Sequence, residues 1–270
     1  MTLDKALYIS QEITPYLPKS VMSVLGRDLP QGIQEKGTEV RTFMPKYGAI
    51  NERRNQLHEV IRLSGLNIVI DDSDHPLIIK VATLQPARMQ VYFIDNDDYF
   101  CRPGAQELEL ESHPEDNDER IMFFVRGVIE TVKKLRWQPS VVHCSGWATA
   151  LAPLYMRNMY HDDPTIKDSK IVYSIYNSEP VAPLDPRMVE KLKMDGFTDE
   201  NLRSLAEADK IDAIALGKIA IDFSDAVVAA VPDAPQELID YAKASGKPFL
   251  DYPGDGDDYV DTYRNFYLSL

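Results

Sequence analysis

Short apolar runs along this chain alternate with longer stretches in which apolar residues recur at helical spacing. Brief runs bounded by polar or turn residues indicate buried strands at 6–10, 40–44, 141–142, 170–175 and 226–230. Amphipathic periodicity indicates helices at about 20–36, 121–135, 187–194, 199–207, 211–222 and 235–244. This alternation predicts an α/β fold of the Rossmann-like type, a three-layer sandwich around a mostly parallel sheet.

The segment 137–157 combines a strand, a turn and a helix. Val141 and Val142 form the β-branched run, His143 to Gly146 form a polar turn, and Trp147 opens the helical spacing. In α/β folds ligands lie beyond the carboxyl ends of the strands. The sequence therefore predicts residues 143–147 at the rim of a site.

The region at about 57–94 does not follow this alternation of strands and helices. Four short β-rich runs, at 59–63, 66–70, 77–84 and 90–94, are separated by turn residues. We expect a small antiparallel or hairpin insertion on the parallel core. Residues 1–246 then form one domain that contains this insertion.

The last 24 residues, 247–270, read as a linker and a helix. Residues 247–258 are rich in Pro, Gly and Asp, and the aromatic residues after them recur on one helical face. These residues are Tyr259, Tyr263, Phe266 and Tyr267, with Leu270 completing the face. Ordering such a face requires packing, so we expect the helix to dock back on the domain.

Composition excludes several classes of partner. The formal net charge is -14, with 29 basic and 43 acidic residues, which disfavours nucleic acid and anionic membranes. The opening residues show no signal peptide, and the most apolar region, 211–231, is interrupted by charges. Cys101 and Cys144 make neither a disulfide framework nor a metal spacing. We expect a soluble, reduced, cytoplasmic protein without a metal or cofactor.

Polar residues that follow predicted strands are the candidate ligand contacts. Gln11 and Glu12 follow the first strand, and Asn177 and Glu179 follow the strand at 170–175. Contact with a sugar and simple loop hydrogen bonding remain open alternatives for these four. His143 is interpreted as a hydrogen-bonded residue at a strand end, with ligand contact open. It cannot form a dyad with Cys144, because adjacent strand residues point to opposite faces.

Two other patterns favour structural roles. The acidic run 95–98 lacks the glycine and terminal glutamate of a calcium loop, so a capped turn is predicted. Trp147 is predicted to be a core residue rather than a stacking platform for a pyranose. No glycine-rich phosphate loop lies between Ile9 and Ser20, where a dinucleotide site requires one.

Several stretches together resemble the first half of bacterial glycogen and starch synthases. They are KALYISQEITPYLPK near the N-terminus, FIDNDDYFCRPG at 93–104, DNDERIMFFVRGVIETVKKLRWQPSVVHCSGWATALAPLY at 116–155, IVYSIYN at 171–177 and ALGKIAIDFSDAVVAAVP at 215–232. They occur in the family's order. The resemblance implies the N-terminal, acceptor-side domain of a GT-B glycosyltransferase that moves glucose from ADP-glucose to an α-1,4-glucan.

The chain departs from the family pattern at three places on the predicted rim. The family's Lys-Thr-Gly-Gly-Leu, whose lysine and glycines approach the sugar nucleotide, aligns with residues 18–22. Here Ser20 and Val21 replace the glycines, and the lysine is displaced by one position, to Lys19. The family's His-Ala-His-Asp-Trp-His turn reads 143–148 here and keeps only His143 and Trp147, with Ser145 in place of the second histidine. The family's Thr-Ile-His-Asn reads Ser-Ile-Tyr-Asn at 174–177.

The resemblance also implies a second, ADP-binding domain after residue 232. The remaining residues are too few for an α/β domain of ~100 residues. The glutamate pairs Glu107/Glu115 and Glu111/Glu119 match the family's glutamate spacing but lack its motif, so they are interpreted as coincidental. The sequence reads as a synthase without its donor domain whose closing helix is kept.

The function predicted is a degenerate synthase domain, without catalytic residues, that binds α-glucan or a synthase-type protein partner. Two alternatives are a half-enzyme completed by a separate donor-domain subunit, and a sensor of sugar phosphates or nucleotides. The candidate ligand contacts are Gln11, Glu12, Lys19, Ser20, His143, Ser145, Asn177 and Glu179. Nothing in the sequence gives the oligomeric state.

Overall fold

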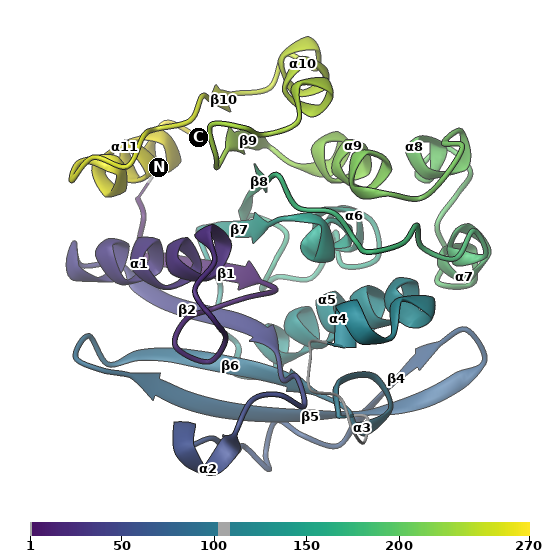
Figure 1. Cartoon of the computed structure of the whole chain (residues 1–270), viewed down its shortest axis with the longest axis horizontal. Helices are drawn as coiled ribbons and strands as arrows, with labels where there is room; N and C mark the ends of the chain where they lie inside the picture. Colours follow the sequence, from purple (N-terminus) through teal and green to yellow (C-terminus); the bar gives the residue numbers. More distant parts are fainter. Residues whose placement is uncertain (1, 102–108) are drawn as a thin grey trace.

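One ten-stranded sheet organises the chain (Figure 1). The structure, a computed structural model, describes residues 2–101 and 109–270. Its strands are β1 (Lys5–Ser10), β2 (Glu39–Pro45), β3 (His58–Glu59), β4 (Leu66–Ile70), β5 (Ser73–Leu84), β6 (Met89–Asp95), β7 (Val141–Ser145), β8 (Lys170–Ile175), β9 (Ala226–Ala229) and β10 (Phe249–Leu250). Their order is β10-β9-β8-β7-β1-β2-β6-β5-β3, and β4 pairs with β5. All neighbours from β10 to β6 are parallel.

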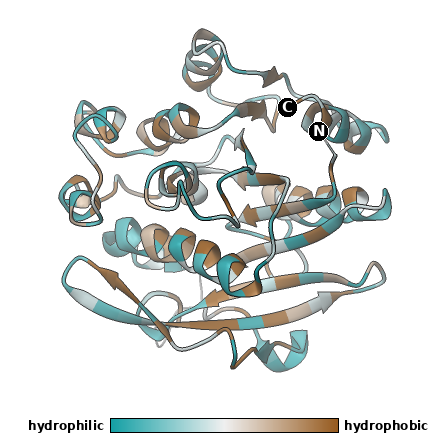
Figure 2. Ribbon diagram, turned by 180° about the vertical axis from the view of Figure 1, so that it is seen from behind, coloured by the Kyte–Doolittle hydropathy of each residue, from teal (hydrophilic) through white to brown (hydrophobic). Residues whose placement is uncertain are grey.

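Helices cover both faces of this sheet. The helices are α1 (Val21–Glu35), α2 (Glu52–Asn55), α3 (Asp97–Phe100), α4 (Glu109–Ser112), α5 (Asn117–Leu135), α6 (Leu151–Arg157), α7 (Met188–Met194), α8 (Arg203–Ala206), α9 (Ala213–Phe223), α10 (Gln236–Ala244) and α11 (Tyr259–Leu268). One group contains α1 and α11, and the other contains α5, α6 and α9, which pack on one another. Figures 1 and 2 show the two groups from opposite sides. The α/β three-layer architecture predicted from the sequence is confirmed.

Burial on both faces explains why the central strands are so apolar. Every residue of β7 is buried, and the central strands are mostly hydrophobic in colour in Figure 2. The helix predicted at 121–135 begins four residues earlier, at Asn117, and buries its apolar stripe against the sheet. In the part of the chain that the structure describes, none of the helices has the length and apolarity that a membrane span requires.

The β-rich region after residue 57 is part of the same sheet. β6 runs parallel to β2, while β5 is antiparallel to β6 and carries β3 and β4 as antiparallel partners. The strand predicted at 59–63 is wrong beyond Glu59, because Val60 to Ser64 form a turn in which the Leu63 amide donates to the Val60 carbonyl. The helix predicted at 199–207 is reduced to Arg203–Ala206.

The last helix, α11, lies on the domain beside α1. Gly32 permits this close approach, since a Cβ atom there would lie 2.8 Å from a Val260 methyl carbon. Lys36 pairs with Asp261 at 2.7 Å. Tyr263 and Tyr267 are buried, so the aromatic face predicted for the tail points into the molecule.

Candidate functional site

The carboxyl ends of three neighbouring parallel strands form the edge where the sequence places a site. Ser10, Ser145 and Ser174 lie side by side in register at the ends of β1, β7 and β8. Residues that follow these strands therefore meet at one edge of the sheet.

Three of the predicted residues form one hydrogen-bonded group after β1. Ser20 Oγ donates to Glu12 Oε2 at 2.5 Å, and Gln11 Nε2 donates to Glu12 Oε1 at 3.2 Å. The Gln11 amide oxygen is buried and has no hydrogen-bond partner among the described residues. Ser20 is also the N-cap of α1, where its hydroxyl accepts from the Ser23 amide. The group presents a carboxylate, an amide and a hydroxyl, the chemistry that hydrogen-bonds a polyol.

The turn after β7 brings Ser145 to the same edge. Gly146 has φ +75, and a Cβ atom there would lie 2.6 Å from the Met22 methyl carbon on α1, so the turn requires glycine. Ser145 is buried and shares a hydrogen bond with the Tyr176 hydroxyl. Trp147 is 4% exposed, which confirms its predicted place in the core.

His143 lies inside the molecule rather than at the rim. Its side chain is 1% exposed, and its two ring nitrogens hydrogen-bond the Ser174 and Tyr267 hydroxyls at 2.8 Å each. Burial lowers the pKa of His143 from its ordinary value to about 3, so the imidazole is neutral. A serine beside an imidazole matches the distance of a nucleophile–base pair. Ser174 is fully buried, however, and no substrate reaches it.

The other three predicted residues are exposed. Lys19 stands just before α1, and Asn177 donates from Nδ2 to Asp233 at 2.7 Å in the loop after β8. Glu179 follows in the same loop. The structure thus groups Gln11, Glu12 and Ser20, places Ser145 and Asn177 along the same edge, and separates His143 from them.

A pocket of about 610 Å³ lies between the start of α1 and the chain that leads into α11. Lys19 and Ser20 line one side, and Tyr252, Asp255 and Tyr259 line the other. The last three were not among the candidate residues. The sequence feature that could have identified them is the high density of tyrosine and aspartate at 251–263. From the sequence alone, these residues are interpreted as a linker and as the docking face of the last helix.

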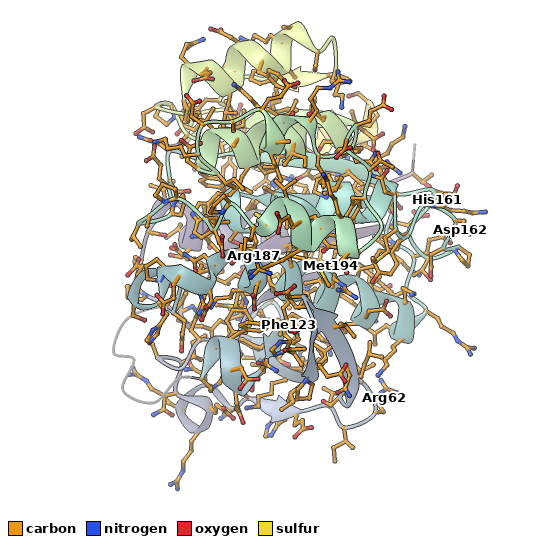
Figure 3. All side chains as sticks on the ribbon, turned by 90° about the vertical axis from the view of Figure 1, so that its right-hand side faces the viewer. Arg62, Phe123, His161, Asp162, Arg187 and Met194 are labelled. Atoms are coloured by element: carbon orange, nitrogen blue, oxygen red, sulfur yellow. The ribbon has the colours of Figure 1, made fainter. Side chains whose placement is uncertain are left out.

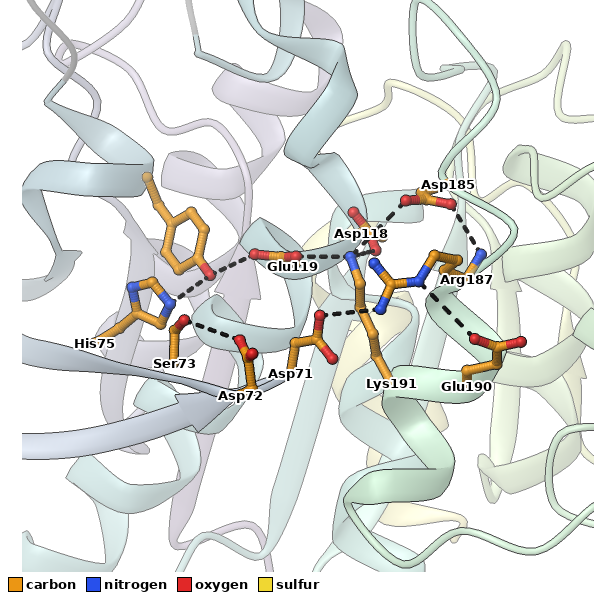
Figure 4. A network of polar contacts seen from close by, with 11 residues as sticks. Asp71, Asp72, Ser73, His75, Asp118, Glu119, Asp185, Arg187, Glu190 and Lys191 are labelled. Carbon is orange, nitrogen blue, oxygen red and sulfur yellow. Dashed lines mark hydrogen bonds and ion pairs between the residues drawn. The ribbon is translucent and has the colours of Figure 1, made fainter.

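Sequence reasoning also missed a network of charges that joins α7 to the start of α5 (Figure 4). Lys191 Nζ lies 2.6 Å from both Asp118 Oδ2 and Glu119 Oε1, and its side chain is 4% exposed. Tyr99 donates to Glu119 and also hydrogen-bonds His75. Figure 3 shows the same side of the molecule, with Arg187 and Met194 at the two ends of α7. Each of these side chains has a partner within the network, although Asp118 Oδ1 is buried without a hydrogen bond among the described residues. We interpret the network as a structural clamp between α5 and α7.

The acidic run at 95–98 is a capped turn, as predicted. Asn96 accepts from the amides of Asp98 and Tyr99 and begins α3, while Asp95 pairs with Lys80 at 2.7 Å. No cluster of three or more His, Cys, Asp or Glu side chains suited to a metal occurs within residues 2–101 and 109–270. Glu107 and the end of the motif at 93–104 lie outside the described residues.

Comparison with known sequences identifies relatives of the chain. Residues 5–247 match the model of the starch synthase catalytic domain. A glycogen synthase of Chlorobaculum parvum is 34% identical over 235 residues, which cover 87% of this chain and 47% of the relative. A glycogen synthase of Chlorobaculum tepidum is 37% identical over 202 residues, which cover 71% of this chain and 41% of the relative. The chain therefore spans about half the length of the relatives it matches.

A solved structure has the same fold. The catalytic domain of starch synthase IV from Arabidopsis thaliana, bound to ADP and acarbose, superposes with a TM-score of 0.72 at 18% sequence identity. The match covers 92% of this chain and 50% of the Arabidopsis chain. The sheet and its flanking helices therefore have the fold of about half of this GT-B structure.

Proposed function

Because this chain belongs to the starch synthase catalytic domain family, we propose that it is a member that binds α-glucan without transferring glucose. The observation that carries the proposal is the state of the end of β7 and of the turn that follows it. Where the family's pattern has three histidines, this chain keeps only His143, and that residue is sealed between Ser174 and Tyr267.

Ser145 occupies the place of the second histidine in that pattern. Its hydroxyl is hydrogen-bonded to Tyr176, and a serine hydroxyl neither holds a positive charge nor exchanges a proton near neutral pH as an imidazole does. This position therefore carries a neutral, buried hydroxyl in place of an imidazole. At this point of the edge the chain therefore has no imidazole that could act as a general acid or base.

The loop after β1 also suits a neutral ligand better than a nucleotide. Glu12 places a carboxylate at the start of α1, where a phosphate-binding loop offers backbone amides. The hydroxyl of Ser20 is occupied by the cap of α1 and by Glu12. The Glu12 carboxylate repels a pyrophosphate group, and its oxygen atoms can accept hydrogen bonds from sugar hydroxyls.

The Arabidopsis structure offers two ligand chemistries for comparison, ADP and acarbose. Acarbose is an oligosaccharide analogue, and ADP is a multiply charged anion. The carboxylate, amide and hydroxyl groups at this edge, together with the formal charge of -14, favour the saccharide class.

Incorporation of labelled glucose from ADP-glucose into glycogen tests the absence of transfer. We expect no label above that of the heat-denatured chain, while a glycogen synthase from Chlorobaculum assayed in parallel gives full incorporation. The donor-side half of that synthase is then added to the chain. Incorporation in this mixture would favour the half-enzyme alternative and contradict a non-catalytic role.

A further inference from the structure

The pocket beside α11 joins Lys19 and Ser20, from the stretch aligned with the family's Lys-Thr-Gly-Gly-Leu, to Tyr252 and Asp255, which belong to none of the stretches that resemble the family. Most of its lining comes from two segments far apart in sequence, residues 19–28 around the start of α1 and residues 252–263, which lie next to each other in Figure 1, and Ala230 after β9 completes it. Its volume of about 610 Å³ lies within the roughly 300–1,000 Å³ of small-molecule sites. It is therefore large enough for a short chain of sugar rings.

Tyrosine rings and aliphatic side chains make most of the pocket wall. Tyr252 and Tyr259 are half-buried, and Val21, on the opposite wall, is 66% exposed. The Tyr252 hydroxyl donates to Asp255, which holds the ring in place. Aromatic rings held with one face toward a pocket bind ligands that combine apolar faces with polar edges, as pyranose rings do.

The charges around the pocket decide which ligand fits. Asp28 and Asp255 line it with carboxylates, and Lys19 is the cation among its lining residues. Two carboxylates against one ammonium group disfavour a phosphate or nucleotide and supply acceptors for hydroxyl groups. The lining thus selects a neutral polyol with apolar ring faces.

From these observations we infer that the pocket between α1 and the α11 segment is the site at which this chain binds α-glucan, with Tyr252 as the ring-stacking residue. The inference rests on the proposed function and places its ligand on the pocket side of Tyr263, whose ring packs against the buried His143. In this site the tail is a wall of the binding pocket as well as a support for the sheet. A linear segment of glucosyl units lies along Tyr252 and Tyr259, with hydroxyl groups toward Asp28 and Asp255.

Calorimetric titration of the whole chain with maltotriose tests the site. We expect Tyr252→Ala to weaken maltotriose binding by roughly tenfold or more, equivalent to about 1.4 kcal/mol. Asp28→Asn, on the other wall, should weaken it as well and serves as the second variant. Tyr241→Ala is the matched control, because Tyr241 is also half-buried and donates to an aspartate, Asp222, but lies on α10 outside the pocket. It should leave binding unchanged.

The outcomes separate the site from the proposed function. If the wild-type chain binds glycogen and maltotriose but Tyr252→Ala and Asp28→Asn bind them equally well, the pocket assignment is wrong and glucan binding stands. If the wild-type chain binds neither glycogen nor maltotriose, both fail. Titration with ADP is the specificity control, and ADP binding that is tighter than ~1 mM and competes with maltotriose would overturn the neutral-ligand assignment.

Discussion

His143 shows how one residue of a family motif can become part of the core. Its ring is surrounded by Tyr8, Tyr263 and Tyr267, and it makes a hydrogen bond at each nitrogen. Nothing in the turn sequence reveals this, because Tyr267 is 124 residues away. The prediction of a hydrogen-bonded histidine at a strand end describes the residue correctly. Its burial is completed by α11, whose aromatic face predicts docking on the domain but does not identify His143 as the residue that it covers.

The buried His143 makes the stability of the fold depend on pH. Between the ordinary pKa of 6.5 and the lowered pKa of about 3, the unfolded chain holds a proton on this residue that the folded chain does not. The neutral, buried His143 therefore contributes fully to the stability of the fold above pH 6.5, and this contribution is lost as the pH falls from 6.5 toward 3. We expect the free energy of unfolding to decrease by about 1.4 kcal/mol per pH unit below 6.5 through this residue.

Urea unfolding at pH 6.5, 5.75 and 5.0 measures this slope in the wild-type chain and in His143→Asn. In the variant, the free energy of unfolding should change with pH only through the other titratable groups. Equal slopes for the two chains would mean that His143 titrates alike in the folded and unfolded states.

Lys191 is the residue on which the clamp between α5 and α7 depends. Lys191→Met keeps the packing of the stem but leaves Asp118, whose side chain is 1% exposed, without its cation. Loss of one partner from such a buried pair costs about 3–5 kcal/mol in the free energy of unfolding. Chemical denaturation provides the measurement.

Lys193→Met is the matched control on the same helix. Lys193 pairs with Asp199, and their side chains are 47% and 87% exposed, so its loss should cost no more than about 1 kcal/mol. Asp118→Asn in the Lys191→Met chain should restore part of the stability. If the two lysine variants unfold alike, the clamp contributes no more than a surface pair.

Among the elements, helices and parallel strands were the best predicted from the sequence. The strand at 170–175 has the predicted limits, and α5, α7, α9 and α10 begin within four residues of their predicted starts, because long periodic patterns specify them. The β-rich runs were predicted less well. Val60 to Ser64 contains apolar residues that suggest a strand, yet local hydrogen bonds close a turn there. Pairing partners in a sheet are set by distant residues, which an alternating pattern does not identify.

The C-terminal helix α11 closes the domain over His143 through two buried tyrosines. Removal of residues 257–270 should lower the free energy of unfolding by several kcal/mol, since Tyr263 and Tyr267 are each buried and such a side chain contributes about 1.5–3 kcal/mol. It should also expose His143 and raise its pKa toward 6.5. Thermal unfolding and NMR titration of the imidazole provide the two measurements.

Tyr267→Phe is the control for this truncation. It keeps α11 and removes one hydrogen bond to His143, which should cost about 1 kcal/mol and leave the imidazole buried. A truncated chain as stable as the wild type, with an unchanged His143 titration, would show that α11 is a loosely attached segment.

For the whole molecule, the candidate site was predicted in part. Strand order brings Gln11, Glu12, Ser20, Ser145 and Asn177 to one edge, as the rule for parallel sheets requires. The pocket was not foreseen, because it exists only where residues 252–263 meet α1. Composition identified those tyrosines and aspartates, but only the folded chain shows that they face a pocket.

Co-sedimentation with glycogen in the presence of labelled ADP-glucose tests the claim that the chain binds α-glucan without transferring glucose, since one pellet reports both binding and transfer. We expect the chain to enter the glycogen pellet and the glycogen to carry no more label than with the heat-denatured chain. The claim is contradicted if the glycogen becomes labelled above that level, or if the chain stays in the supernatant.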